Sequence, residues 1–345
     1  MIGGGYGTGR EVVEYFTMQG VTGGVLGLGV ATLTFALILA ATYEFARCFR
    51  AYDYRHFFKT LIGRGWVAYE VVYIITIMLI LAVVSSAASD VLKDQLGWSA
   101  WLSTGAMLIA VTTMAFYGRE FVSRIMTFWA ILLSAIFVLY FVLVVAQFGP
   151  ETAAAWEAGG VAGSWARKGM QFALYNVAMA PALLFAAREI ATRREAILAG
   201  VITALAATLP ALLFHLSFVA RYAEVSAQPL PVYWMISSLG ANWFMSLYLI
   251  GLFGTLVQTG IGVIQGLIER IDGWRKDSGG APLGKPGHAL LGLAAITISG
   301  MLSAVGIITL VAQGYGSLAW AFMIIYPLPL LTVGLLRLAR ARTAT

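Results

Sequence analysis

Ten long apolar segments, nearly free of charge, follow one another along the chain. A helix that crosses a membrane needs about 20 consecutive apolar residues, and every segment except the short first one has this length. The segments are 2–18, 21–48, 66–92, 98–117, 119–148, 167–191, 195–221, 241–271, 287–312 and 315–338. Because lipid offers no partner for free backbone groups, such segments form helices and not open strands. We therefore expect an all-α membrane protein with ten transmembrane helices.

The composition excludes a soluble protein. Charged residues make up 11% of the chain and hydrophobic residues 60%, whereas a soluble domain contains about 25% charged residues. The net charge of +6 would suit nucleic-acid binding, but the basic residues lie in short clusters between apolar segments, which is a pattern that sets membrane topology. The expected partners are the lipid bilayer and a small-molecule substrate, with no nucleic acid. The single cysteine, Cys48, can form no internal disulfide bond.

Lysine and arginine are concentrated in alternate connections between the segments. Seventeen of the 22 lie at or beyond the ends of the second, fourth, sixth, eighth and tenth segments. Basic residues favour the cytoplasmic side of a membrane. The distribution therefore predicts that both termini are cytoplasmic, and the regular alternation supports the count of ten.

Two of the segments are interrupted by residues that break helices, and the interruptions match. The first is broken from Gly3 to Gly9, before Arg10-Glu11-Val12, and the sixth is broken from Tyr175 to Pro181, before Arg188-Glu189-Ile190. A shift of 178 positions places one Arg-Glu pair on the other. Broken helices at corresponding places in two halves indicate the binding site of a secondary transporter.

The same shift relates other segments of the two halves. It carries 21–48 to 199–226, near the seventh segment, and 66–92 to 244–270, on the eighth. Five segments per half is an odd number, so the second half is expected to be inverted relative to the first. We expect one integral membrane domain of two repeats, 1–148 and 167–338. A half-helix should precede the first break in this topology. Either a segment upstream of the given chain is missing, which is the interpretation that we favour, or this protein lacks that half-helix.

The opening of the chain resembles a known family. The run from Gly3 to Glu11, followed by an apolar helix, looks like the "GAGxATGQE" opening of YkvI-like bacterial membrane proteins, although Arg10 stands where that family often has glutamine. The stretch Thr259 to Arg270 in the eighth segment is also similar to that family. The family is placed near the amino acid–polyamine–organocation superfamily. The resemblance implies a LeuT-type fold in a bacterial cytoplasmic membrane.

The helix breaks are the expected substrate site. Broken helices leave backbone N–H and C=O groups free to bind a ligand, and the resemblance implies that the third and eighth segments complete such a site. The candidate substrate-binding residues are Gly3, Gly4, Gly5, Tyr6, Gly7, Thr8, Tyr73, Tyr175, Asn176, Met179 and Ala180. The alternative interpretation is that these small residues only allow helices to pack closely.

The coupling ion is left open between Na⁺ and H⁺, and no other metal or cofactor is expected. Thr255, Gln258 and Thr259 in the eighth segment would supply oxygens for Na⁺, unless the two threonines bond to their own helix. Glu70 in the third segment would carry a proton, unless it forms an ion pair with a nearby arginine. No arrangement of a nucleophile and a base indicates an enzyme.

Several polar residues allow two interpretations. Arg10, Glu11 and Glu14 follow the first break and would form a gate, whereas Arg10 and Glu14 are also spaced to pair with each other. His215 in the seventh segment is expected to be a hydrogen-bonded packing residue and not a titrating group. The segment 228–240 is expected either to contain a short helix over the entrance or to be a plain interfacial loop.

The sequence thus predicts a secondary active transporter of a small organic solute, such as an amino acid or related zwitterion, that works by alternating access coupled to Na⁺ or H⁺. The alternative is a solute sensor or membrane assembly factor with the same fold that transports nothing.

Overall fold

The computed structural model describes residues 4–99, 101–103, 105–106 and 119–343, and none of these residues forms a β-strand. The helices before residue 160 are α1 (Gly4–Gly7), α2 (Arg10–Tyr15), η1 (Thr17–Gln19), α3 (Val21–Phe49), α4 (Tyr54–Ile62), η2 (Gly63–Gly65), α5 (Trp66–Leu96) and α7 (Arg119–Ala158). The later helices are α8 (Trp165–Val177), η3 (Ala180–Glu189), α9 (Arg193–Phe218), η4 (Val219–Arg221), α10 (Tyr222–Ser226), α11 (Pro231–Leu239), α12 (Asn242–Asp277), α13 (Lys285–Ser303), α14 (Ile307–Thr309), η5 (Leu310–Tyr315), α15 (Gly316–Ile325), α16 (Pro327–Pro329), η6 (Leu330–Gly334) and α17 (Leu335–Thr343).

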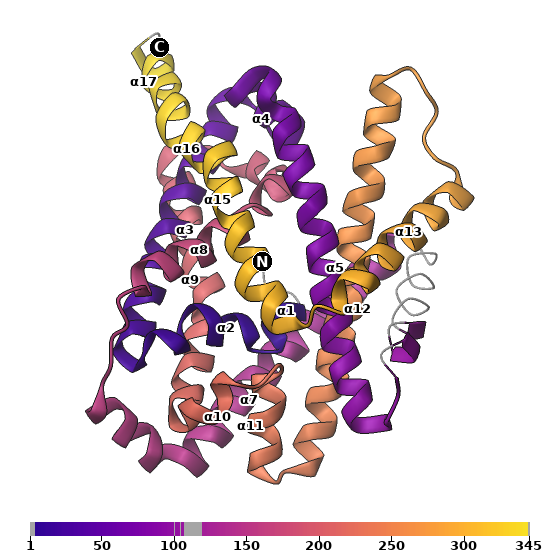
Figure 1. Ribbon diagram of the computed structural model, residues 1–345. Helices are drawn as coiled ribbons and strands as arrows, with labels where there is room; N and C mark the ends of the chain where they lie inside the picture. Colours follow the sequence, from indigo (N-terminus) through magenta and orange to yellow (C-terminus); the bar gives the residue numbers. More distant parts are fainter. Residues whose placement is uncertain (1–3, 100, 104, 107–118, 344–345) are drawn as a thin grey trace.

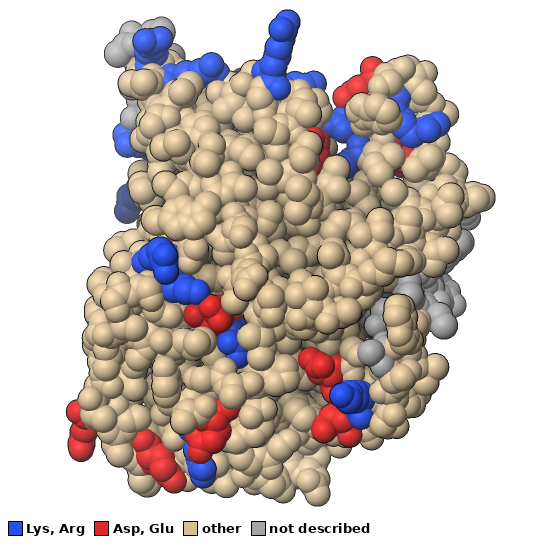
Figure 2. Space-filling view, in the orientation of Figure 1, with Lys and Arg blue, Asp and Glu red and all other residues tan. Residues whose placement is uncertain are grey.

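Seven helical segments of the described chain are long and apolar enough to cross a membrane. They are Val21–Phe49, Tyr54–Leu96, Ile131–Ala158, Arg193–Ser226, Asn242–Asp277, Pro286–Ser303 and Ile307–Ala341. On the face shown in Figure 2, charged side chains gather toward the two ends, and the surface between them is uncharged apart from small mixed groups. The protein is therefore an all-α, multi-pass membrane protein, as predicted. Most of the predicted fourth segment, 98–117, lies outside the described residues.

The first predicted segment is discontinuous. Gly9 separates α1 from α2 with a φ of +78°, a backbone conformation that residues with a side chain rarely adopt. An added Cβ at Gly9 would lie 2.6 Å from the Phe218 ring and 2.8 Å from the Val232 side chain. In Figure 1, α2 runs across the long helices at mid-height. The glycine-rich opening therefore produces a sharp change of direction inside the bundle.

The sixth predicted segment is also discontinuous. The α-helix α8 ends at Val177, and after a turn the chain continues as the 3₁₀-helix η3. Pro181 lies at the start of η3, where its missing N–H group and its ring prevent an α-helix from continuing. The two interruptions that the sequence predicted are thus both present.

The predicted boundary between the last two segments is wrong. The predicted segments 287–312 and 315–338 left a connection at 313–314, but α13 ends at Ser303 and the chain turns at Gly306, whose φ is +87°. From there the helix continues through η5, a π-helical stretch, into α15. Gly314 lets η5 approach α5 so closely that an added Cβ would lie 2.8 Å from the Leu79 side chain. The turn at Gly306 therefore sets this boundary, and Gly314 and Gly316, which resembled a loop, lie inside helices.

Two helices extend beyond their predicted ends. The helix predicted to end at 148 bends at Phe148, whose φ of −113° is not helical, and continues to Ala158. Pro150 follows this kink and removes a backbone N–H donor there. The helix α12 continues to Asp277, beyond the predicted end at 271.

Long helices from the two halves pack closely on each other. The most extensive contact joins α3 to α9, and α5 packs along α12 and α13. Small residues make this approach possible, because an added Cβ at Gly200 of α9 would lie 2.5 Å from the backbone nitrogen of Ala40. The same holds for Gly169 of α8, whose Cβ would lie 2.2 Å from the carbonyl oxygen of Gly27.

Two short helices occupy equivalent places in the chain. The helix α4 connects α3 to α5, and α11 precedes α12 after the α9 segment. Both have nine residues, and they begin and end 177 positions apart. Figure 1 places α4 near one end of the molecule and α11 near the other. The short helix that was one interpretation of the segment 228–240 is therefore present.

Candidate functional site

A tyrosine from α12 caps the first helix break. The Tyr248 hydroxyl donates a hydrogen bond to the carbonyl oxygen of Gly7 over 3.1 Å, and the Tyr248 side chain is fully buried. The next carbonyl, that of Thr8, accepts from the backbone N–H of Val232 in α11 over 3.1 Å. The backbone groups that the break frees are thus satisfied by α11 and α12, which belong to the second half of the chain.

A tyrosine from α5 caps the second break in the same way. The Tyr69 hydroxyl donates a hydrogen bond of 2.9 Å to the carbonyl oxygen of Ala178, which lies in the turn between α8 and η3. Tyr69 is also fully buried. Each half of the chain therefore supplies the tyrosine that caps the break in the other half.

The predicted substrate residues of the first break differ in their surroundings. Gly3 lies outside the described residues, and Gly4 and Gly5 form the start of α1. The Tyr6 hydroxyl donates to the carbonyl oxygen of Ala207 in α9, over 3.2 Å. Thr8 is buried, and its side-chain oxygen accepts from the backbone N–H of Arg10.

The predicted residues of the second break are divided between buried and accessible positions. Tyr175 and Ala180 are buried, whereas Asn176 and Met179 are partly exposed. The Asn176 amide donates to the carbonyl oxygen of Phe172 one turn earlier, over 3.0 Å. This hydrogen bond holds the Asn176 amide nitrogen against its own helix.

An aromatic cluster that the sequence did not predict surrounds Tyr175. The Tyr315 ring of η5 stacks on the Tyr175 ring with centroids 4.7 Å apart, and the Tyr15 ring of α2 lies 5.5 Å away. Phe172 adds an edge-to-face contact with Tyr175. Tyr315 was not singled out because it begins the tenth predicted segment, directly after the expected connection, where nothing marked it as part of a site.

The predicted gate residues separate into two places. Arg10 and Glu14 form an ion pair of 3.3 Å, and the Lys168 ammonium binds the other Glu14 oxygen over 2.7 Å. The Arg10 guanidinium also donates to the carbonyl oxygens of Ser226 and Gln228, beside α10. The pairing interpretation of Arg10 and Glu14 is confirmed.

Glu11 points elsewhere, because one residue further along a helix faces a different side. Its carboxylate accepts a hydrogen bond from the hydroxyl of Tyr175 in α8. Glu11 therefore joins the two discontinuous segments of the chain directly.

Glu70 is held in a cluster of charges and aromatic rings between α4, α5 and α12. Its carboxylate pairs with Arg270, and Arg55 lies 3.7 Å from it. The Arg270 guanidinium lies over the rings of Tyr73 and Tyr54, at 3.7 and 3.9 Å. The ion-pair interpretation of Glu70 is confirmed, and the predicted substrate residue Tyr73 belongs to this cluster.

The threonines of the expected sodium site bond to their own helix. The Thr255 hydroxyl donates to the Gly251 carbonyl, and the Thr259 hydroxyl donates to the Thr255 carbonyl, both over 2.8 Å. Thr255 and Gln258 also line a cavity of about 420 Å³ between α7, α9 and α12. The alternative interpretation of these threonines is thus confirmed.

His215 is a packing residue, as expected. One ring nitrogen lies 2.8 Å from the Val21 carbonyl oxygen and the other 3.3 Å from the Thr17 hydroxyl. The ring fills the space over Gly24, where an added Cβ would lie 2.2 Å from it.

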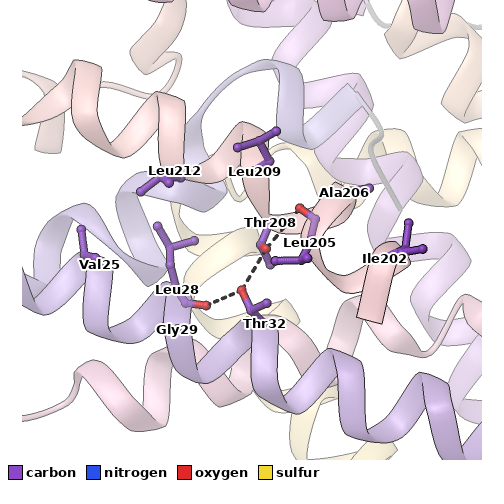
Figure 3. A pocket seen from close by; sticks show the side chains of 10 residues that line it. All are labelled: Val25, Leu28, Gly29, Thr32, Ile202, Leu205, Ala206, Thr208, Leu209 and Leu212. Atoms are coloured by element: carbon purple, nitrogen blue, oxygen red, sulfur yellow. Dashed lines mark hydrogen bonds between the residues drawn. The ribbon is translucent and has the colours of Figure 1, made fainter. Parts of the chain in front are cut away.

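A larger cavity of about 530 Å³ lies between α3 and α9 (Figure 3). Leucine and isoleucine side chains dominate its lining, and the hydroxyls of Thr32 and Thr208 bond to each other over 2.9 Å. Leu205 and Leu209 of this lining are 54% and 57% exposed, on a surface that a bilayer would cover. The chemistry of this cavity suits lipid chains and not a polar solute.

Searches with the whole chain found no matching family model and no matching curated protein.

Proposed function

We propose that this protein is a secondary active transporter that carries a small organic solute across a bacterial cytoplasmic membrane by alternating access. The observation that carries the proposal is the reciprocal capping of the two helix breaks. Tyr248 of the second half caps the break at Gly7, and Tyr69 of the first half caps the break at Ala178. Broken helices inside a membrane protein supply the backbone groups that bind substrate.

Further contacts favour a LeuT-type inverted repeat of ten spans, with repeats at 1–148 and 167–338. In a two-fold arrangement, helices that lie next to the axis pack against their counterparts from the other half. The pairs α3 with α9 and α5 with α12 are in contact. The same relation would place α4 and α11 at opposite ends, as Figure 1 shows them. The sequence shift of 178 positions relates α3 to α9, α4 to α11 and α5 to α12, and it carries α2 to 188–193, at the end of η3.

The breaks suit an amino acid or a related zwitterion. Carbonyl oxygens such as those of Gly7 and Ala178 are suited to accept hydrogen bonds from an ammonium group. In the structure, each of the two accepts a hydrogen bond from a neutral tyrosine hydroxyl. A substrate ammonium would form a charge-assisted hydrogen bond in place of each neutral one, and such bonds are stronger. The stacked rings of Tyr175 and Tyr315 would then form an apolar wall beside the substrate.

Uptake by the purified protein in proteoliposomes tests this proposal. A thermal-shift panel of the standard amino acids first identifies a ligand, because ligand binding raises the unfolding midpoint. We expect saturable uptake of that ligand, driven by an ion gradient, in vesicles that contain the protein and not in empty vesicles. Saturable binding without flux under any ion gradient would contradict transport and favour the solute sensor.

A further inference from the structure

Glu11 is buried at the meeting point of the two discontinuous segments. Its side chain is 6% exposed and lies in α2, directly after the first break. The hydrogen bond from Tyr175 ties it to α8, just before the second break. Any movement of α2 relative to α8 must change this contact.

Glu11 differs from the other buried carboxylates in its partner. Glu14 is paired with Arg10 and Lys168, and Glu44 is paired with Arg47. Among the described residues, the hydrogen-bond partner of Glu11 is the neutral hydroxyl of Tyr175. A carboxylate that is buried without a cation costs free energy when it is charged, and protonation removes this cost.

The groups around Glu11 are mostly tyrosines. Tyr175 of α8 binds Glu11, and the rings of Tyr15 of α2 and Tyr315 of η5 pack against the Tyr175 ring. Tyr6 of α1 is close enough to interact with Glu11 electrostatically. The basic and acidic groups of the neighbouring elements are bound elsewhere: Arg10 and Lys168 at Glu14, His215 of α9 at Val21 and Thr17, and Glu224 of α10 beside Arg221. No described basic side chain forms an ion pair with the Glu11 carboxylate, and the amino-terminal charge of the given chain acts on it electrostatically without an ion pair among the described residues.

We propose that Glu11 binds the proton that drives transport, an inference that rests on the proposed function. When the site opens to water on one side, the carboxylate takes up a proton from water and becomes a neutral carboxylic acid. When the site opens to the other side, the acid releases the proton to water there. A charged carboxylate accepts the Tyr175 hydrogen bond more strongly than a neutral acid, so protonation loosens the contact between α2 and α8.

The same geometry favours H⁺ over Na⁺. A sodium ion in such a fold is held by several oxygens at once. Here one hydroxyl, that of Tyr175, is hydrogen-bonded to the carboxylate, and the hydroxyls of Thr255 and Thr259 are turned to their own helix. Binding a proton requires only one carboxylate oxygen, and it does not require a cavity lined by several oxygens.

Infrared spectroscopy tests protonation without knowledge of the substrate. We expect the carbonyl-stretch band of a protonated carboxylic acid in the lipid-reconstituted protein at neutral pH, and its loss in Glu11→Gln. Glu44→Gln is the matched control, because Glu44 is buried but paired with Arg47 and should contribute no such band. Tyr175→Phe keeps the carboxyl group and removes its donor, so the band should shift even if Glu11→Gln folds poorly. A carboxylic-acid band that stays the same in both Glu11→Gln and Tyr175→Phe would overturn the proposal.

Flux measurements separate this inference from the proposed function. Proteoliposomes are filled with a pH-sensitive dye and supplied with a mixture of labelled standard amino acids. We expect a proton gradient to drive uptake, and uptake to carry protons inward. Glu11→Gln should abolish both effects, but the variant should still exchange substrate across the membrane. Uptake that does not depend on the proton gradient, and that Glu11→Gln does not change, would overturn the proton site but not the proposed transport function. Absence of uptake under every gradient would overturn the transporter itself, and the infrared band would still report whether Glu11 binds a proton.

Discussion

Gly9 is the residue at which the first segment changes direction. Its φ of +78° costs little for glycine, but it would strain any residue with a Cβ atom. The neighbouring rings and methyl groups also fill the space beside it. The requirement for glycine at this position is therefore both conformational and steric.

Gly9→Ala should lower the free energy of unfolding by roughly 1–3 kcal/mol, because the added methyl group is overpacked against Phe218 and Val232. Thermal unfolding in detergent measures the effect. Gly29→Ala is the matched control, since no atom lies within 4 Å of a Cβ built at Gly29. Equal midpoints for the two variants would contradict the strained turn.

At the scale of the elements, the two breaks are held by hydrogen bonds between the halves. Tyr69 reaches from α5 to the turn after α8, and Tyr248 reaches from α12 to α1. A buried hydroxyl that satisfies a freed carbonyl also occupies the position that a ligand donor would take. In the proposed transporter, these two tyrosines would stabilise the substrate-free protein and compete with substrate.

Tyr69→Phe and Tyr248→Phe should each destabilise the free protein by about 1–2 kcal/mol, because a buried carbonyl loses its donor. The rise of the unfolding midpoint on ligand addition should become larger, since the ligand no longer displaces a hydroxyl. Tyr326→Phe is the control, because the Tyr326 hydroxyl bonds to Thr42 over 2.5 Å and to neither freed carbonyl. A ligand-induced shift that all three variants leave unchanged would contradict the competition.

At the scale of the whole molecule, two ionic clusters lie toward opposite ends. One joins Glu70 to Arg55 and Arg270, near α4. The other joins Glu14 to Arg10 and Lys168, near α10 and the connection to α11. Alternating access would require one cluster to open while the other stays closed.

Single-cysteine labelling tests this arrangement, and replacing Cys48 by serine removes all native cysteine. On that background, Ala178→Cys at the second break should react slowly with a membrane-impermeant maleimide. Glu70→Gln should speed the reaction from the cytoplasmic side, and Glu14→Gln should speed it from the outer side. Ala281→Cys, at an exposed position after α12, controls for reagent access. Faster reaction from the same side in both variants would contradict two opposed gates.

Much of the architecture could be predicted because it depends on local chemistry. Runs of apolar residues fix helices in a membrane, and glycine or proline fixes where a helix breaks. The breaks at Gly9 and before Pro181 follow directly from these residues. The boundary near Gly306 could not be found in this way. The residues that resemble a loop lie further along the chain, in the π-helical stretch η5, and they drew the predicted boundary there.

The sequence by itself determined the membrane class, most of the helices and the two interruptions, because each depends on residues that are neighbours in the chain. Only the tertiary structure decided the partners of the polar groups. Arg10 and Glu14 share one face of α2, whereas Glu11 lies on another face and meets Tyr175 of α8. Which helix lies against each face depends on packing between distant segments, and this packing leaves Glu11 with a neutral partner.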